Sequence, residues 1–204
     1  MPELLIFGRT EGAPYHPLEP LKDDLLSLFG GKQQAECTES PGRLNDLATS
    51  GVKTLVALDD NWNEPLDVTA LFSVERWVRK GGNLLVIHNG ICWARHRRWK
   101  SLAAASFVGH EPAKLLTFGR PDGTHFELFE EPYRFSFARG KAKTVLATYR
   151  DEGKDWPAAW FCPVGKGRIT YALPGHFPTA FQVPLYRNWL KEWATPAPDE
   201  GASL

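Results

Sequence analysis

The sequence predicts an α/β fold with a doubly wound, mostly parallel, flavodoxin-like sheet and helices on both faces. In the N-terminal half, short apolar segments alternate with segments of helical period. Residues 84–87 (LLVI) are apolar without alternation, which is typical of a strand covered on both faces. Such β-α-β alternation implies right-handed crossovers between parallel strands.

The N-terminal half is predicted to begin with a strand and to alternate strands with helices. The helix at 18–29 has apolar residues at helical spacing and stops at Gly30-Gly31. The helix at 67–80 starts at Asp67 as N-cap and ends before Gly81-Gly82. The strands are expected at 3–8, 33–38, 53–58 and 84–87, and a third helix at 91–107.

The C-terminal half is predicted to add short strands and a β-hairpin. The hairpin joins 157–164 to 168–173 through Gly165-Lys166-Gly167. The last helix is expected at 183–193, with Pro184 in its first turn. The remaining strands are expected at 114–118, 126–129, 133–137 and 145–149. Without an internal repeat or linker, residues 1–194 are expected to form one domain, and 195–204 a flexible tail.

The composition narrows the class of protein and its partners. The chain has 204 residues, with 24 Lys and Arg against 24 Asp and Glu, so its formal charge is zero and no nucleic-acid partner is expected. Its three cysteines form no CxxC pair, which favours reduced thiols in a cytoplasmic protein. No signal peptide or membrane helix is expected. Surface apolar residues would allow a homo-oligomer, but the sequence identifies no interface.

The strand at 84–87 is followed by His88-Asn89-Gly90, a sharp Asn-Gly turn with a histidine at its tip. Ligands of parallel sheets bind at the carboxyl ends of the strands. Many α/β enzymes hold a serine or cysteine nucleophile on such an elbow. An imidazole is instead suited to act as an acid, a base or a metal ligand. We therefore expect His88 to lie at the functional site.

Five spaced segments carry a family resemblance that covers nearly the whole chain. They are 7–12 (FGRTEG) followed by His16, 78–82 running into 87–88, 107–112 (FVGHEP), 130–133 (EEPY), and 156–160 (WPAAW) leading to 165–171 and 174–176. In their order and spacing they resemble the trehalose-utilization ThuA-like family, a branch of the class I glutamine-amidotransferase-like superfamily. The resemblance implies a pocket at the strand ends and use of trehalose or related sugars through oxidised (keto) intermediates.

The chain departs from the amidotransferase relatives at the elbow itself. Those relatives carry a cysteine there, paired with a downstream histidine and an acid, whereas this chain has His88. Cys92 lies about one helical turn further on, where a small buried thiol is expected. Glutamine amidotransfer through a thiolate is therefore not expected. The chain is also short between Gly119 and Glu130, which trims the loop that covers the pocket in the family.

Four of the six histidines fall where the family pattern has one: His16, His88, His110 and His176. In a parallel sheet, His16, His88 and His176 all follow strands and would meet at the carboxyl edge. His110 follows the helix expected at 91–107, so the predicted topology gives less support for its lying at the same edge. His88 and His176 are the expected acid and base residues. His96 and His125 are expected at the surface.

A carboxylate and several sugar-binding candidates complete the predicted site. Glu131 and Tyr133 are two residues apart in an extended segment, so they should share one face, with Glu130 pointing the other way as a surface charge. Glu131 could orient an imidazole or act as the general base. The expected substrate-binding residues are Arg9, Thr10, His16, Asn89, His110, Tyr133 and Trp160, the last as an aromatic wall for sugar C–H faces.

Three functional hypotheses remain open from the sequence. The first is an enzyme acting on a sugar or keto-sugar through His88, His176 and Glu131. The second is a metal-dependent hydrolase or isomerase, in which two or three of the candidate ligands His16, His88, His110 and His176 bind zinc or a similar divalent ion. The third is a non-catalytic sugar-binding or assembly module. Imidazole nitrogens within about 4–5 Å of one point would favour the metal.

Overall fold

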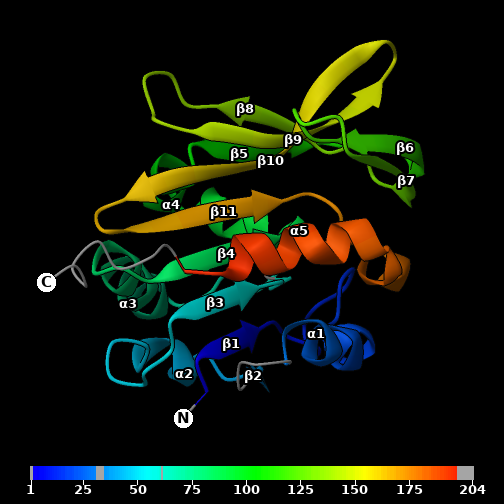
Figure 1. Ribbon diagram of the computed structural model, residues 1–204. Coiled ribbons are helices and arrows are strands. Elements are labelled where there is room, and N and C mark those ends of the chain that lie inside the picture. Colours follow the sequence, from blue (N-terminus) through cyan, green and yellow to red (C-terminus); the bar gives the residue numbers. More distant parts are fainter. Residues whose placement is uncertain (1, 31–34, 61, 197–204) are drawn as a thin grey trace, which may run out of the picture.

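The structure is a computed structural model that describes residues 2–30, 35–60 and 62–196 (Figure 1). Its strands are β1 (Leu4–Phe7), β2 (Ala35–Thr38), β3 (Thr54–Ala57), β4 (Asn83–Ile87), β5 (Ala105–Gly109), β6 (Lys114–Gly119), β7 (His125–Glu130), β8 (Arg134–Phe137), β9 (Thr144–Asp151), β10 (Lys154–Val164) and β11 (Gly167–Ala172). Its helices are α1 (Lys22–Phe29), α2 (Gly42–Asn45), α3 (Val68–Arg79), α4 (Arg97–Leu102) and α5 (Pro184–Ala194), with 3-10 turns η1 (Glu19–Leu21), η2 (His88–Arg95) and η3 (Pro178–Gln182).

A nine-stranded sheet of the described residues has the order β2-β1-β3-β4-β11-β10-β9-β6-β7. The strands from β2 to β11 in that order are parallel to their neighbours. From β11 onwards each pair is antiparallel. A separate antiparallel pair, β5 and β8, forms a second sheet. The α/β class predicted from the sequence is confirmed.

The burial of the strands explains the two halves of the sheet. Every residue of β1, β3 and β4 is buried, because helices cover both faces of the parallel half. Figure 1 shows α5 in front of this half and α3 behind it. In β7, exposed and buried residues alternate instead, so that one face of the antiparallel half meets solvent. The change from continuous to alternating apolar residues therefore marks the change in strand direction.

Helix α3 begins where its sequence predicts. The Asp67 carboxylate accepts a hydrogen bond of 3.0 Å from the backbone N–H of Thr69, which is the N-cap interaction. Trp77 and Val78 turn the apolar side of the helix into the core. At the far end, Gly82 lies against Trp77, and a Cβ at Gly82 would approach the indole ring to 2.4 Å. The predicted cap and end of this helix are confirmed.

Replacing Asp67 by alanine should destabilise the protein by about 1 kcal/mol, because the first turn of α3 loses its side-chain acceptor. Chemical denaturation of the two proteins measures this difference in free energy of unfolding. The control is Asp67→Asn, which keeps a side-chain oxygen and should remain close to wild type. An asparagine variant as unstable as the alanine variant would show that the cap is not what Asp67 contributes.

The prediction of a helix at 91–107 is wrong. That segment contains the end of η2, the short helix α4, and strand β5. His96 separates η2 from α4 with an extended backbone, φ −72° and ψ 124°. Ala104 has φ +56°, which ends the helical run before β5 begins. His110 consequently follows strand β5 directly.

Smaller differences concern the second sheet and two segment ends. The strand expected at 133–137 is β8, which pairs with β5 outside the main sheet. Helix α2 was not expected from the sequence. Residues 33 and 34 of the second expected strand, and 197–204 of the expected tail, lie outside the described residues.

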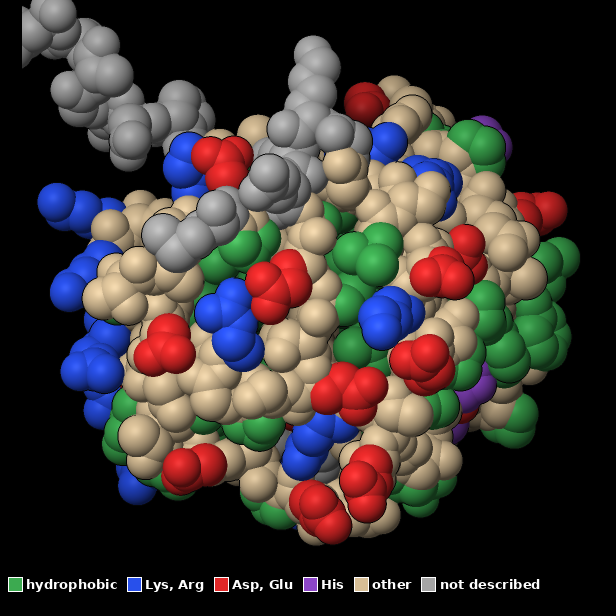
Figure 2. Space-filling model, turned by 90° about the horizontal axis from the view of Figure 1, so that it is seen from below, with side chains coloured by type: hydrophobic (Ala, Val, Ile, Leu, Met, Phe, Trp, Pro, Cys, Tyr) green, Lys and Arg blue, Asp and Glu red, His purple; other side chains and the backbone are tan. Residues whose placement is uncertain are grey.

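The distribution of charged side chains on the surface agrees with the formal charge of zero. On the face shown in Figure 2, acidic and basic side chains are interspersed across the middle. No helix in the described part of the chain is long and apolar enough to cross a membrane.

Candidate functional site

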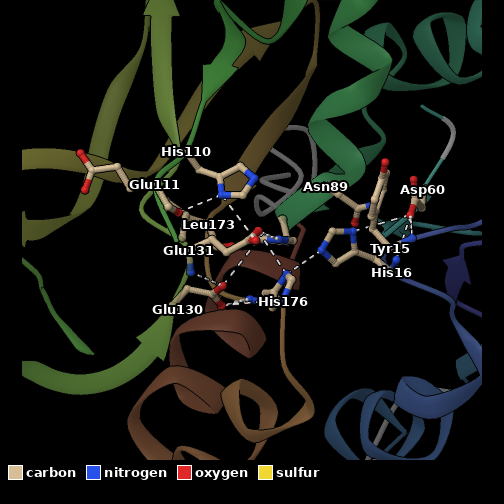
Figure 3. A network of polar contacts seen from close by, with 12 residues as sticks. Tyr15, His16, Asp60, Asn89, His110, Glu111, Glu130, Glu131, Leu173 and His176 are labelled. Carbon is tan, nitrogen blue, oxygen red and sulfur yellow. Dashed lines mark hydrogen bonds and ion pairs between the residues drawn. The ribbon is translucent and has the colours of Figure 1, made fainter. Parts of the chain in front are cut away.

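Four loops bring a cluster of imidazole and carboxylate groups together at the carboxyl edge of the parallel strands. His16 lies in the loop after β1, His88 directly after β4, Glu131 directly after β7, and His176 after β11. One side-chain donor atom from each of these residues lies within 4.8 Å of the others. Figure 3 shows His16, Glu131 and His176 pointing toward one another. The predicted convergence of the three strand-end histidines is therefore observed, and Glu131 joins them.

The elbow that carries His88 has a strained backbone. His88 has φ +47°, which is uncommon for a residue with a side chain. A glycine on each side makes the close packing possible: a Cβ at Gly90 would lie 2.6 Å from the Ala57 carbonyl oxygen, and one at Gly175 would lie 3.0 Å from the His88 Cβ. Strain of this kind persists only where the surrounding structure enforces it, and it is concentrated at functional sites.

The hydrogen bonds of His88 fix its tautomer. Its Nδ1 lies 2.8 Å from the Leu173 carbonyl oxygen, which only accepts hydrogen bonds, so Nδ1 carries the proton. In the neutral ring Nε2 then has a free electron pair. Nε2 is buried and has no hydrogen-bond partner among the described residues. Burial lowers the pKa of His88 to about 4, against the opposing effect of Glu131, so the ring is neutral at physiological pH.

Glu131 lies between imidazoles. Its Oε2 is 3.1 Å from His176 Nδ1 and 3.5 Å from His88 Nε2, and its Oε1 is 3.4 Å from His110 Nδ1. Burial alone would raise the pKa of Glu131, but the His176 and His88 rings outweigh burial and hold that pKa well below its usual range. Glu131 in turn raises the pKa of His176, although burial opposes this. The carboxylate is therefore ionised and faces several imidazole nitrogens.

His16 and Asp60 extend the cluster. His16 Nε2 lies 2.8 Å from His176 Nδ1, and His16 Nδ1 lies 3.6 Å from Asp60 Oδ2. The same Asp60 oxygen accepts the backbone N–H groups of Tyr15 and His16, each at 2.8 Å. Asp60, in the loop after β3, thus holds the loop after β1 in place and faces the outer nitrogen of His16.

The prediction that Glu130 is a surface charge is wrong. Its side chain is 0% exposed. Oε2 accepts the N–H groups of Gly175 and His176 at 2.7 and 3.1 Å, and Oε1 accepts the N–H of Glu131 at 2.9 Å. Burial raises the pKa of Glu130 to about 7, against the lowering effect of these N–H groups. The alternation of β7 places Glu130 in phase with the buried Leu128, and this signal in the sequence could have identified it.

Glu131 and Tyr133 do not share a strand face as predicted. The chain leaves β7 after Glu130, and the Tyr133 N–H donates to the Glu131 carbonyl oxygen at 2.9 Å in a tight turn. Both side chains nevertheless reach the site. The Tyr133 ring packs on the His88 ring with centroids 4.4 Å apart, and on the His110 ring at 5.3 Å.

A cavity of about 520 Å³ opens onto the cluster. Aromatic side chains and polar groups both line it, which suits a ligand with apolar faces and hydroxyl groups. Sequence reasoning missed most of the aromatic wall, because it is drawn from separate loops and strand β5. The lining residues are Tyr15, His16, Trp62, Asn63, Phe107, His110, Glu131, Tyr133 and His176.

Asp59 fixes several of the predicted site residues behind the cluster. Its carboxylate accepts from Arg9 Nε at 2.8 Å and from Trp93 Nε1 at 2.9 Å. Its carbonyl oxygen accepts from Asn89 Nδ2 at 3.3 Å and from Cys92 Sγ at 3.1 Å. Arg9 and Asn89 therefore hold the loops around the elbow. Neither lines the cavity.

Thr10 and Trp160 also lie away from the cavity lining. Thr10 bonds through its hydroxyl and its N–H to the Glu39 carboxylate. Trp160 is buried in the core, where its indole N–H donates to the Ala103 carbonyl oxygen at 2.9 Å and its ring lies 4.4 Å from that of Tyr171. The Trp160 ring also packs against Phe135 and Phe137 of the second sheet, with centroids 4.9 and 5.0 Å apart, so the structure does not show its predicted role as an aromatic wall.

Comparison with known proteins gives one family and several similar structures. The family model ThuA, described as trehalose utilisation, matches residues 3–193. Among solved structures, a ThuA-like protein from Parabacteroides merdae ATCC 43184 is 14% identical, with a TM-score of 0.74 over 94% of this chain and 87% of that one. A ThuA-like protein from Bacteroides uniformis ATCC 8492 is 15% identical, also with a TM-score of 0.74, over 94% and 90% of the two chains.

Part of a larger glycosidase has a similar fold. A GH42 β-galactosidase from G. stearothermophilus is 15% identical, with a TM-score of 0.66, and the match covers 94% of this chain but 29% of that one. No curated protein matches the sequence. At these identities the solved structures show a shared fold.

Proposed function

The chain belongs to the ThuA family of trehalose utilisation, and we propose that it acts on trehalose or a related disaccharide, in its keto form, by proton transfer at the His–Glu cluster. We define the His–Glu cluster as His16, His88, Glu131 and His176. The observation that carries the proposal is the ionised Glu131 carboxylate, held among imidazoles where the aromatic-walled cavity opens. This arrangement supports a positioned base with acids beside it.

The chemistry that fits is proton abstraction from the carbon next to a ketone. In this proposal Glu131 takes that proton, and the electron pair of the broken C–H bond moves into an enolate whose oxygen needs a hydrogen-bond donor or a cation. His176, whose pKa Glu131 raises, can donate a proton to the enolate oxygen or to a departing sugar oxygen. In elimination the enolate electrons expel the sugar oxygen from the next carbon, so that this C–O bond breaks and His176 protonates the departing oxygen. In isomerisation His176 protonates the enolate oxygen, the resulting enediol gives its other hydroxyl proton back to His176, and Glu131 returns its proton to the former carbonyl carbon.

The walls of the cavity support a sugar as the substrate. Tyr133, Phe107 and Trp62 offer ring faces for sugar C–H groups, and His110 and Asn63 offer polar contacts for hydroxyl groups. The keto form is proposed because a ketone acidifies the neighbouring C–H bond, which a carboxylate base can then break. A neutral imidazole stands at the elbow in place of a cysteine, so covalent acyl chemistry has no nucleophile there.

Incubation of the purified protein with trehalose and with its keto derivative tests the proposal. Nuclear magnetic resonance of the mixture should show a new product from the keto-sugar and none from trehalose itself. Calorimetry in parallel measures binding of the same sugars. Saturable binding of both sugars without any product would instead support the non-catalytic sugar-binding module.

A further inference from the structure

We propose that His16, His88, His176 and Glu131 bind a divalent transition-metal ion such as zinc. The first argument is the electron pair of His88 Nε2. The bond from Nδ1 to Leu173 aims this pair at Glu131 Oε2, 3.5 Å away. Both atoms are acceptors, and Nε2 is without a hydrogen-bond partner in the described part of the chain. Two acceptors that face each other in a buried place are stabilised by a cation between them.

The spacing of the donor atoms fits one ion. Bonds of about 2.0–2.2 Å to zinc in a tetrahedron place the ligand atoms about 3.3–3.6 Å apart. The separations here are 2.8 Å for His16 Nε2 and His176 Nδ1, 3.1 Å for His176 Nδ1 and Glu131 Oε2, and 3.5 Å for Glu131 Oε2 and His88 Nε2. All four donors lie within 4.8 Å of one another. Coordination of one ion would therefore move the two closest pairs apart and draw the more distant donors together.

Two of the three histidines direct their outer nitrogen as metal-bound histidines do. A metal-bound imidazole usually directs its second nitrogen to a carbonyl or a carboxylate, which fixes the ring orientation. His88 directs Nδ1 to the Leu173 carbonyl oxygen, and His16 directs Nδ1 toward Asp60 at 3.6 Å. Glu130 fixes the backbone of both Glu131 and His176. The site is therefore built from loops that are held independently of any ion.

The donor set favours zinc over magnesium or calcium. Imidazole nitrogens suit zinc, cobalt, nickel, copper and iron, whereas magnesium and calcium take oxygen ligands. His16, Glu131 and His176 also line the cavity, so a sugar oxygen can approach the ion from that side. An ion held there polarises a carbonyl group.

This inference rests on the proposed function only for the identity of the substrate. Ion binding is measured without sugar, so the two proposals can fail separately. An ion at this site would supply the positive charge next to the enolate oxygen, a role that the mechanism without an ion gives to His176. Glu131 Oε1, which lies 3.4 Å from His110 Nδ1, remains available for the proton.

Titration of the chelator-treated protein with zinc, in competition with a coloured chelator, tests the inference. One equivalent should bind tightly, and cobalt in place of zinc should give the intense visible bands of four- or five-coordinate cobalt. His88→Gln should weaken zinc binding by at least about 100-fold, more than the loss of an outer-shell partner. The matched control is His125→Gln, since His125 is an exposed histidine at the start of β7, and it should bind like wild type.

Circular dichroism establishes that each variant is folded, and His16→Gln serves as a second ligand variant if His88→Gln does not fold. The inference would be overturned if the wild-type protein bound zinc no more tightly than the two ligand variants. It would also be overturned if bound cobalt gave the weak visible bands of octahedral coordination. A product that depends on Glu131 would still support the sugar chemistry in that case. Tight zinc binding without any product would leave the metal site standing and reject the proposed function.

Discussion

Glu131→Gln should lower kcat for the keto-sugar by about 10²–10⁴-fold, the range for loss of a general base. Glutamine keeps the size and the hydrogen-bonding oxygen of glutamate, but it cannot accept the substrate proton. Because Glu131 Oε2 lies 3.1 Å from His176 and 3.5 Å from His88, the change also removes the negative charge that raises the pKa of His176. Steady-state kinetics with the keto-sugar measures the effect.

The matched control for Glu131 is Glu127→Gln, because Glu127 is an exposed glutamate on the same strand, β7. It should leave kcat and KM unchanged. If Glu131→Gln retained more than about a tenth of the wild-type kcat, short of the general-base range, Glu131 would not be the base. Thermal unfolding of both variants should stay close to wild type, which separates the loss of chemistry from a loss of folding.

Glu130→Ala should have the largest effect on stability, about 3 kcal/mol. The change leaves the N–H groups of Gly175, His176 and Glu131 without their acceptor in a buried place, and each unsatisfied buried group costs about 1–3 kcal/mol. Removal of the buried carboxylate offsets part of that sum. The same variant should lose turnover, because Glu131 and His176 are no longer held at their present distance. Urea denaturation measures the free energy of unfolding.

Two further variants show whether the effect of Glu130 comes from these hydrogen bonds. Glu130→Gln keeps one acceptor oxygen and should lose less stability than the alanine variant. Glu127→Ala, at the exposed position of the same strand, should change the free energy of unfolding by no more than about 0.5 kcal/mol. A Glu130→Ala protein as stable as Glu127→Ala would contradict the role assigned to the buried carboxylate.

The parallel half of the fold could be predicted because its local and global signals agree. The apolar runs of β1, β3 and β4 lack alternation, and the cap at Asp67 and the glycines after α3 delimit the helix between strands. The elbow at His88 followed from the same pattern. Since parallel strands end at one edge, the loops with His16, His88 and His176 had to meet there.

The segment after the elbow could not be predicted because its local signals are weak and mixed. Residues 91–107 contain enough apolar residues for a helix, yet the left-handed backbone of Ala104 and the β-branched and aromatic run of β5 break it. Placing β5 against β8 depends on contacts distant in sequence. Phe107 lies on β5 and lines the cavity. Because the sequence does not predict β5, it does not predict this part of the aromatic wall either.

Glu130 and Glu131 are adjacent but have different roles, because strand β7 ends between them. The end of β7 places Glu130 inward, where it binds backbone N–H groups, while Glu131 begins the turn that reaches the imidazoles. Glu131 is predicted from the sequence as a site residue and lies among the histidines, whereas Glu130 is predicted at the surface because a fully buried carboxylate is rare. Trp160 was misassigned for the opposite reason: tryptophans of the core and of a sugar-binding wall look alike in a sequence.

The most direct test of the proton-transfer chemistry is exchange of the sugar hydrogen next to the ketone. The wild-type protein is incubated with the keto-sugar in heavy water, and deuterium at that carbon is followed by nuclear magnetic resonance. We predict exchange far faster than in buffer with wild type and with Glu127→Gln, and none above the buffer rate with Glu131→Gln. Binding of the keto-sugar to the wild-type protein, with exchange no faster than in buffer, would contradict the account.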